Sequence, residues 1–551
     1  MSMRAGASTV LVAIILVASA CTGDSDDSAA PPQTVTVTSI VEIPGETVTV
    51  TSIVTETITV EVPAETTPPT AAPIDERSVL VVATPDSIRS FDPAIGIQFR
   101  DLNIYQQIYE TLVLQRADGT IERVLATGWT ISDDGLTYTF NLREGVVFSN
   151  GEPFEADDVA FSFLRYQEQG VPLVRARWER VASVTAIDPL TVEFKLTEYD
   201  AGFFPNLTNP LLLANSILNR EATEAADPSI SPVGTGPFVV ESFSPGSDMV
   251  LARNENYWKP GVPAVDKLIV RSIPVQTSQV SALTAGEIDI MFPTAATALT
   301  LEGTENITLL GLPSAETIGI QLHAGREPFD DVNVRRAVAL AIDRQQVIDL
   351  AYFGGAAAAA GTVSSAYEWA PAPGELPYTE YDPDEAIRLL TEAGFPDGFD
   401  VEILTLAGHE PWGPLLEVVA SQLKDVGINA TIVNAETGVW LDGFLNGNFQ
   451  ITNHHFVFGP DPFQYLRIRR GRNGPIPDEL AALEDAVIAE PDLEARIDLL
   501  QQILAYQVDI VYPNIAIVSP NLWIAYRDGL ENVNFDFTGR LSFLAEVEVA
   551  G

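Results

Sequence analysis

Cysteine is almost absent from this chain of 551 residues, because Cys21 is the only one. A disulfide within the chain is therefore excluded, and so is a metal site built from several thiolates. Histidine is scarce as well, with four residues, which leaves few candidates for a general base. The nucleotide-binding pattern G-x-x-x-x-G-K-[ST] and the nucleophile pattern G-x-S-x-G do not occur. If ATP is used, a separate subunit must handle it.

Basic residues are also few. Lysine and arginine together number 30 against 76 acidic residues, and the formal net charge is −46. A phosphate backbone requires a basic surface, so nucleic acid is disfavoured as a partner. Two explanations of the acidity stay open, namely solubility in a salty habitat and attraction of cationic ligands.

The first 21 residues have the pattern of a lipoprotein signal. Arg4 precedes an apolar run over Val10–Ala18, and two small residues stand before Cys21. That run is about half of the roughly 20 residues that a membrane-spanning helix requires. We therefore expect lipidation of Cys21 and a location on the extracytoplasmic face of the cell membrane.

Residues 22–77 form a Thr- and Pro-rich acidic segment. The sequence TVTVTSIV occurs at 34–41 and again at 47–54, a short repeat in a low-complexity stretch. Alternating Thr and Val could form a small β structure, but the prolines argue against long paired strands. A tether is the favoured interpretation, and such a composition can also carry O-glycans.

The remainder is long enough for two or more lobes, and its composition is that of an ordinary globular protein. Its most informative stretch is 125–163, where D-D-G and N-G turns separate short apolar runs. The sequence predicts a hairpin around Gly135, a further strand over 146–148, and a helix opened by Asp157 and Asp158.

Later in the chain, strand, helix and strand follow one another at 401–406, 415–426 and 428–433. This order is a βαβ unit and predicts parallel pairing in an α/β lobe. Just before it, Asp382 is expected to cap a helix whose apolar stripe is Ile387, Leu390 and Ala393.

Several motifs together resemble the family 5 solute-binding proteins of ABC importers, which include oligopeptide, dipeptide and nickel binders. These motifs are the 125–163 stretch, GTGPF at 234–238, NENYW at 254–258, GEID at 286–289 and PFDDVNVRRAV at 328–338. The resemblance implies an α/β, two-lobed, periplasmic-binding-protein-like fold of the large class II type, with an extra subdomain in the first lobe. It implies a binding protein with no cofactor and no catalytic residues.

The same resemblance suggests an arrangement of the whole chain. The expected parts are a signal peptide (1–21), a tether (22–77), lobe I in three pieces (78–110, 231–322 and 518–551), the extra subdomain (111–230) and lobe II (323–517).

The expected function is capture of peptides or peptide-like solutes in a cleft between the lobes, by a monomer that delivers them to ABC permease and ATPase subunits. An extracellular hydrolase with two carboxylates is the alternative from another class. Receptors of the same fold for nickel or oligosaccharides are further alternatives.

The segment NHHFVFGPDPFQYL is rich in aromatic rings, and the resemblance places it on the cleft wall. Adjacent His454 and His455 could share a metal ion only if the backbone bends between them, so no metal site is expected. Peptide binders of this kind hold the ligand's amino group with an Asp, whereas Phe458 stands at the corresponding position here, and Asp461 could take that role after a shift of the loop. The expected ligand-binding residues are Gln98, His409, Trp412, Trp440, Asn453, His455, Phe456, Phe458 and Asp461.

Overall fold

The computed structural model describes residues 79–85, 90–95, 99–116, 120–209, 214–244, 248–407, 412–457, 478–506, 514–535, 539 and 541–549. All of them belong to the compact unit that begins at Ile74. Cys21 and the segment 22–77 lie outside the described residues. Among those described, no helix is both long enough and apolar enough to cross a bilayer.

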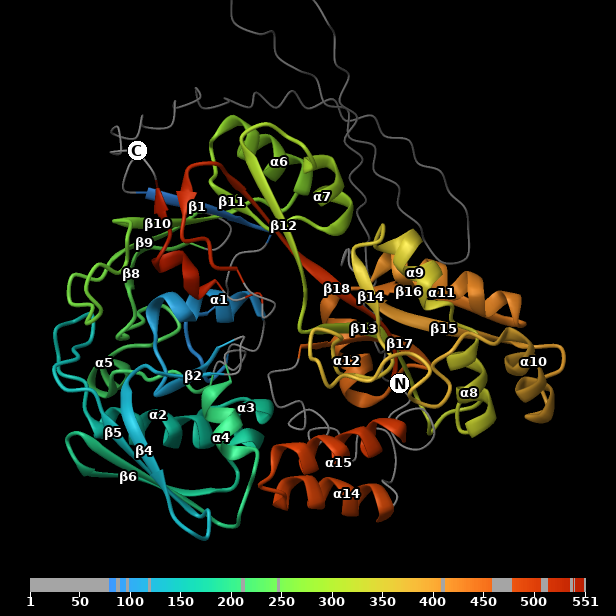
Figure 1. Ribbon diagram of the computed structural model, residues 1–551, viewed down its shortest axis with the longest axis horizontal. Coiled ribbons are helices and arrows are strands. Elements are labelled where there is room, and N and C mark those ends of the chain that lie inside the picture. The colour runs from blue at the N-terminus through green and yellow to red at the C-terminus, as the bar shows by residue number, and fades with distance from the viewer. Residues whose placement is uncertain are drawn as a thin grey trace, which may run out of the picture. The chain divides into compact units, whose positions relative to one another are not determined.

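One large mixed sheet runs through the described chain (Figure 1). In its first half the strands lie in the order β8-β9-β10-β1-β11, with β1 parallel to β10 and to β11. This half consists of β1 (Val79–Thr84), β8 (Phe238–Ser242), β9 (Met249–Arg253), β10 (Lys267–Ser272), β11 (Ile290–Met291), β12 (Ile307–Pro313) and helices α1 (Phe99–Ile108), α6 (Gln276–Ala285) and α7 (Ala295–Leu301).

The GTGPF motif explains where α1 stops. The helix ends at Ile108, whose carbonyl accepts a hydrogen bond from the Gly236 N–H at 2.8 Å. A Cβ on Gly234 would lie 2.1 Å from the same oxygen. Glycine is therefore required there because the two backbones are in contact.

A separate four-stranded antiparallel sheet, β4-β5-β7-β6, carries the predicted hairpin, with Gly135 at φ +67° in its turn. The helix predicted at Asp157 begins at Ala156, where Glu155 and Asp158 form a capping box. The strand expected over 146–148 is wrong, because Val147 makes a single isolated bridge to Pro153. This region contains β2 (Val113–Gln115), β3 (Ile121–Arg123), β4 (Ala126–Ile131), β5 (Thr137–Leu142), α2 (Ala156–Gln169), α3 (Pro172–Arg177), β6 (Val181–Asp188), β7 (Thr191–Leu196), α4 (Phe203–Thr208) and α5 (Arg220–Ala225).

The second half of the large sheet has the order β16-β15-β17-β13-β18. The predicted βαβ unit is confirmed, since β15 and β16 pair in parallel along their whole length. The predicted stripe on α10 is partly wrong, because Ile387 is exposed while Leu389 and Leu390 are buried. The elements are β13 (Glu316–Leu322), α8 (Val332–Leu340), α9 (Arg344–Ala351), β14 (Ala356–Ala358), α10 (Pro383–Glu392), β15 (Phe399–Leu406), α11 (Gly413–Asp425), β16 (Ile428–Ala435), α12 (Thr437–Asn446), β17 (Ile451–Val457), α14 (Asp478–Ala489) and α15 (Leu493–Ala505).

Strand β18 (Asn514–Arg527) joins the two halves. Its first part pairs with β13 and its last part with β11 and β12. The chain then closes with β19 (Leu530–Glu531), the 3₁₀ turn η1 (Ser542–Ala545) and β20 (Glu548–Val549). Each half has its own buried apolar cluster, one containing Leu80 and Phe163 and the other Ile320 and Val419.

Candidate functional site

The chain order around β15 creates a topological switch point. From β15 the chain crosses through α11 to β16 on one side, and then through α12 back past β15 to β17. Right-handed crossovers in opposite directions place the two helices on opposite faces of the sheet, as Figure 1 shows. Ligands of open α/β sheets bind at the carboxyl ends of the strands at such a point.

Two tryptophans lie where this rule places a ligand. Trp412 is the N-cap residue of α11, and Trp440 is in the first turns of α12. Their ring centroids are 5.9 Å apart with the planes inclined at 32°. Trp412 is 5% exposed, whereas Trp440 is half-buried and can offer part of its ring to a solute.

Trp440 is held in a fixed position by strand β17. Its indole Nε1 donates to Asn453 Oδ1 at 3.0 Å and approaches Thr452 Oγ1 at 3.3 Å. The Thr452 hydroxyl in turn donates to the Leu404 carbonyl of β15 at 2.8 Å. Because both acceptors are buried and Thr452 is itself bonded to β15, the ring is oriented before any ligand arrives.

A carboxylate and an imidazole complete this group. Strand β13 is antiparallel to β17, so its first residue, Glu316, lies beside the carboxyl end of β17. His455 Nε2 is 3.4 Å from Glu316 Oε2, and the His455 ring centroid is 6.1 Å from that of Trp412. Burial and then the negative charge of Glu316 raise the pKa of the nearby Tyr352 hydroxyl.

Further aromatic rings stack on Trp440. Phe444 stacks on Trp440 with centroids 5.5 Å apart, and Phe449 stacks on Phe444 at 6.4 Å. His323 meets the edge of Phe449 at 5.4 Å, and burial lowers the pKa of that imidazole, with a further contribution from Arg326.

The structure thus brings together four of the predicted binding residues, which are Trp412, Trp440, Asn453 and His455. Phe456 pairs through its backbone with Thr317 on β13. The other predictions lie outside the described residues: Gln98, His409, Phe458 and Asp461. The sequence did not single out Glu316 or Phe444, which the structure places beside His455 and Trp440.

The two adjacent histidines are part of regular pairing, His454 opposite Gly319 and His455 opposite Ile318. The bend that joint coordination requires is therefore not present in this strand. Within the described ranges, no group of three or more His, Cys, Asp or Glu side chains is placed to hold a metal ion.

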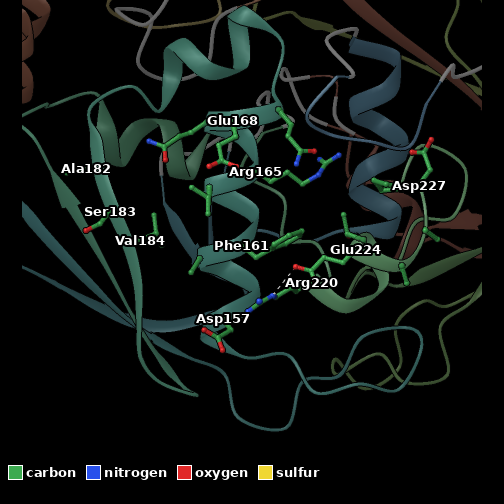
Figure 2. Close-up of a pocket in the computed structure, with 18 residues that line it drawn as sticks. Asp157, Phe161, Arg165, Glu168, Ala182, Ser183, Val184, Arg220, Glu224 and Asp227 are labelled. Carbon is green, nitrogen blue, oxygen red and sulfur yellow. Dashed lines mark hydrogen bonds and ion pairs between the residues drawn. The ribbon is translucent and has the colours of Figure 1, made fainter.

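A concavity lies on the four-stranded unit, between α2, α5 and β6 (Figure 2). Its volume is about 970 Å³, and its lining includes Phe161, Glu168 and Asp227. Arg165 is engaged there by a bidentate bond to buried Asp92, and Arg220 bonds Glu224. This groove is open and acidic and shares no lining residue with the tryptophan site.

A large sheet shared by two α/β halves is the architecture of a two-domain solute-binding protein. Comparison with known proteins agrees. Residues 120–474 match the model of bacterial extracellular solute-binding proteins, family 5 Middle. The chain belongs to family 5 of the extracellular solute-binding proteins, which bind solutes for transport and are not enzymes.

Individual relatives differ in what they bind. Over 363 residues the chain is 31% identical to the glutathione-binding protein GsiB of Salmonella paratyphi A, covering 65% of this chain and 70% of that protein. The periplasmic binding protein DppA from Helicobacter pylori, in complex with the peptide STSA, superimposes with a TM-score of 0.76 at 26% identity over 86% of this chain and 99% of that one. NikZ from Campylobacter jejuni, in complex with Ni(L-His), gives 0.74 at 19% identity over 85% and 99%.

Proposed function

We propose that this protein is the lipid-anchored receptor of an ABC importer, and that it captures peptides or peptide-like solutes at the tryptophan site and delivers them to a permease. The observation that carries the proposal is the fixed pair Trp412 and Trp440 at the switch point. Large apolar surfaces with a few oriented polar groups are typical of sites for small solutes. The relatives with named peptide and glutathione ligands support the substrate class.

In this proposal the lobes comprise residues 78–110, 231–322 and 518–551 on one side and 323–517 on the other, with 111–230 as the extra subdomain. The binding residues include Trp412, Trp440, Asn453 and His455, together with Gln98, His409, Phe456, Phe458 and Asp461. Cys21 carries the lipid and 22–77 is the tether. The protein works as a monomer.

The test of the ligand class is a thermal-shift screen of the purified protein against short peptides, glutathione, oligosaccharides and Ni²⁺. A ligand at a hundredfold excess over its Kd stabilises the folded state by about 2.7 kcal/mol, which a melting curve resolves. A peptide or glutathione is expected to shift the melt. A shift with Ni²⁺ or an oligosaccharide alone would contradict the proposed class.

Trp440→Ala tests the location of the site. The substitution should weaken binding of the selected peptide at least tenfold, because a desolvated aromatic anchor is lost. Trp129→Ala is the matched control, since Trp129 is also half-buried but lies on β4 in the other sheet. Equal losses in the two variants would refute the assignment.

The anchor is tested separately with Cys21→Ser. The variant should be released into the medium or accumulate as an unprocessed precursor, as cell fractionation would show. Processed, membrane-retained protein would refute lipidation at this residue.

A further inference from the structure

We infer that the groove between α2, α5 and β6 (Figure 2) binds an extended, basic segment of a partner protein, which pairs as an added strand with the edge of the four-stranded sheet. The inference goes beyond solute capture, because this groove and the tryptophan site have no lining residue in common. It depends on an open sheet edge, a partly apolar floor and acidic ends.

The sheet edge is the first of these features. Strand β6 stands last in the order β4-β5-β7-β6, and in the part of the chain that the structure describes it pairs with β7 alone. Its residues 183–186 pair regularly, between two shifts of register. Every second residue of an edge strand turns its N–H and C=O groups away from the sheet. An extended peptide can therefore hydrogen-bond to β6 through its main chain.

The groove follows this edge. Ser183 and Val184 both line it, and adjacent residues of a strand point to opposite faces, so a cavity that reaches both lies beside the strand. The Gln167 side-chain amide of α2 donates to the carbonyls of Trp178 and Val181 at 2.9 and 2.8 Å. These bonds fix the helix against the start of β6, so the groove is formed before a peptide binds.

Helix α2 lies between β6 and α5 and forms the floor of the groove (Figure 2). Leu164 follows Phe161 by three residues and Ala160 by four, so these lining side chains share one face of the helix. Leu164 is 51% exposed. A single exposed leucine is ordinary, but this one borders an open strand edge. An apolar side chain of an added strand would cover it and remove apolar surface from water.

The ends of this floor are acidic. Asp157 and Glu168 are exposed and lie at opposite ends of α2 (Figure 2). Their positions in the sequence correspond to about 16 Å along a helix. An extended strand advances about 3.3 Å per residue, so about five residues span that distance. The groove therefore suits a short segment with a basic residue near each end.

The two arginines that line the groove do not cancel this acidity. Arg165 forms a bidentate bond to buried Asp92, and Arg220 is paired with Glu224. Asp227 adds a further exposed acid on the side of the groove away from β6. Lysine or arginine side chains of a bound segment would thus be attracted along the whole groove.

The charge of the chain also selects the occupant. The segment 22–77 contains ten acidic residues and one basic residue, and a second copy of the chain has a net charge of −46, so the acids of the groove repel both. A free peptide of this length loses its translational freedom for few contacts at an open surface. A segment of a larger partner that also contacts the protein elsewhere binds at a high effective concentration.

The probe for the test is the peptide Lys-Val-Thr-Val-Lys, labelled with a fluorophore and capped by acetyl and amide groups so that it resembles the interior of a longer chain. Fluorescence anisotropy at low ionic strength measures its binding. The wild type should bind this probe and should not bind the version with Glu at both ends. N-methylation of alternate amides should weaken binding at least about tenfold in one of the two possible patterns, because hydrogen bonds to the edge of β6 are lost.

Protein variants locate the probe. Asp157→Asn combined with Glu168→Gln should weaken binding about threefold to tenfold, the effect of losing two exposed ion pairs. Asp133→Asn combined with Glu144→Gln is the matched control, since these exposed acids belong to the same region and do not line the groove. The control and Trp440→Ala should both bind the probe as the wild type does.

Several results would overturn the inference. It fails if the probe does not bind, if both methylated patterns bind as well as the parent peptide, or if the groove double variant keeps wild-type affinity. Loss of probe binding in Trp440→Ala would assign the probe to the solute site. Sedimentation of the wild type as a dimer that the probe dissociates would assign the β6 edge to a second copy. The thermal-shift screen tests solute capture independently, so failure here leaves the proposed function standing.

Discussion

Gly319 shows how tightly single residues constrain the centre of this fold. It lies in β13, between β17 and β18, at the point where the pairing with β18 shifts register. A Cβ built on Gly319 would lie 2.0 Å from the Ile515 carbonyl oxygen, and that oxygen is backbone, so it cannot rotate away. Nothing in the local sequence ETIGIQL signals this contact, because the strand that makes it comes almost two hundred residues later.

Gly319→Ala should therefore destabilise the protein by about 1–3 kcal/mol through forced displacement of β18. Chemical denaturation monitored by circular dichroism would measure the change. Gly128→Ala on β4 is the control, because a Cβ added to Gly128 would meet no atom within 4 Å, and its effect should be much smaller. Equal effects at the two glycines would show that strand propensity, and not the contact, is responsible.

At the scale of elements, the sequence predicted what depends on local pattern. The hairpin at Gly135, the α2 start and the parallel βαβ unit followed from turn residues and periodicity. The strand order β16-β15-β17, which creates the site, did not, because strand order depends on packing between distant segments. Five of the predicted binding residues came from one aromatic segment: Asn453, His455, Phe456, Phe458 and Asp461. Glu316 comes beside His455 only through the pairing of β13 with β17.

Glu110 connects the end of α1 with the NENYW segment that follows β9. It follows α1, and its carboxylate accepts hydrogen bonds from Tyr257 Oη at 2.9 Å and Trp258 Nε1 at 3.0 Å, which hold the NENYW segment in place. Burial raises the pKa of Glu110 to about 7, against the hydrogen bonds from Trp258, Thr235 and Tyr257, which lower it. Burial likewise raises the pKa of Asp158 to about 6.

Both folded-state pKa values lie above the unfolded ones, so the folded state binds more protons than the unfolded state in this range. The free energy of unfolding should therefore decrease as pH rises from about 4.5 to 7, by on the order of 2–3 kcal/mol from Glu110. Denaturant titrations across that range would measure the slope. Glu110→Gln should flatten it, and an unchanged slope in this variant would assign the pH dependence to other groups.

For the whole molecule, the two halves are joined by few strands. The chain passes from β12 into β13 over residues 313–316, and β18 pairs with both halves. Glu316 begins the strand that follows this passage, and Trp440 lies on α12 in the second half. We expect binding to stabilise a closed arrangement, with the aromatic contacts supplying the energy and the connecting strands bending.

Small-angle X-ray scattering with and without a saturating peptide tests this account most directly. The account predicts that the radius of gyration of the wild type decreases when the peptide binds, and that Trp440→Ala shows no decrease at the same peptide concentration. A peptide that binds tightly by calorimetry and leaves the radius of gyration of the wild type unchanged would contradict it.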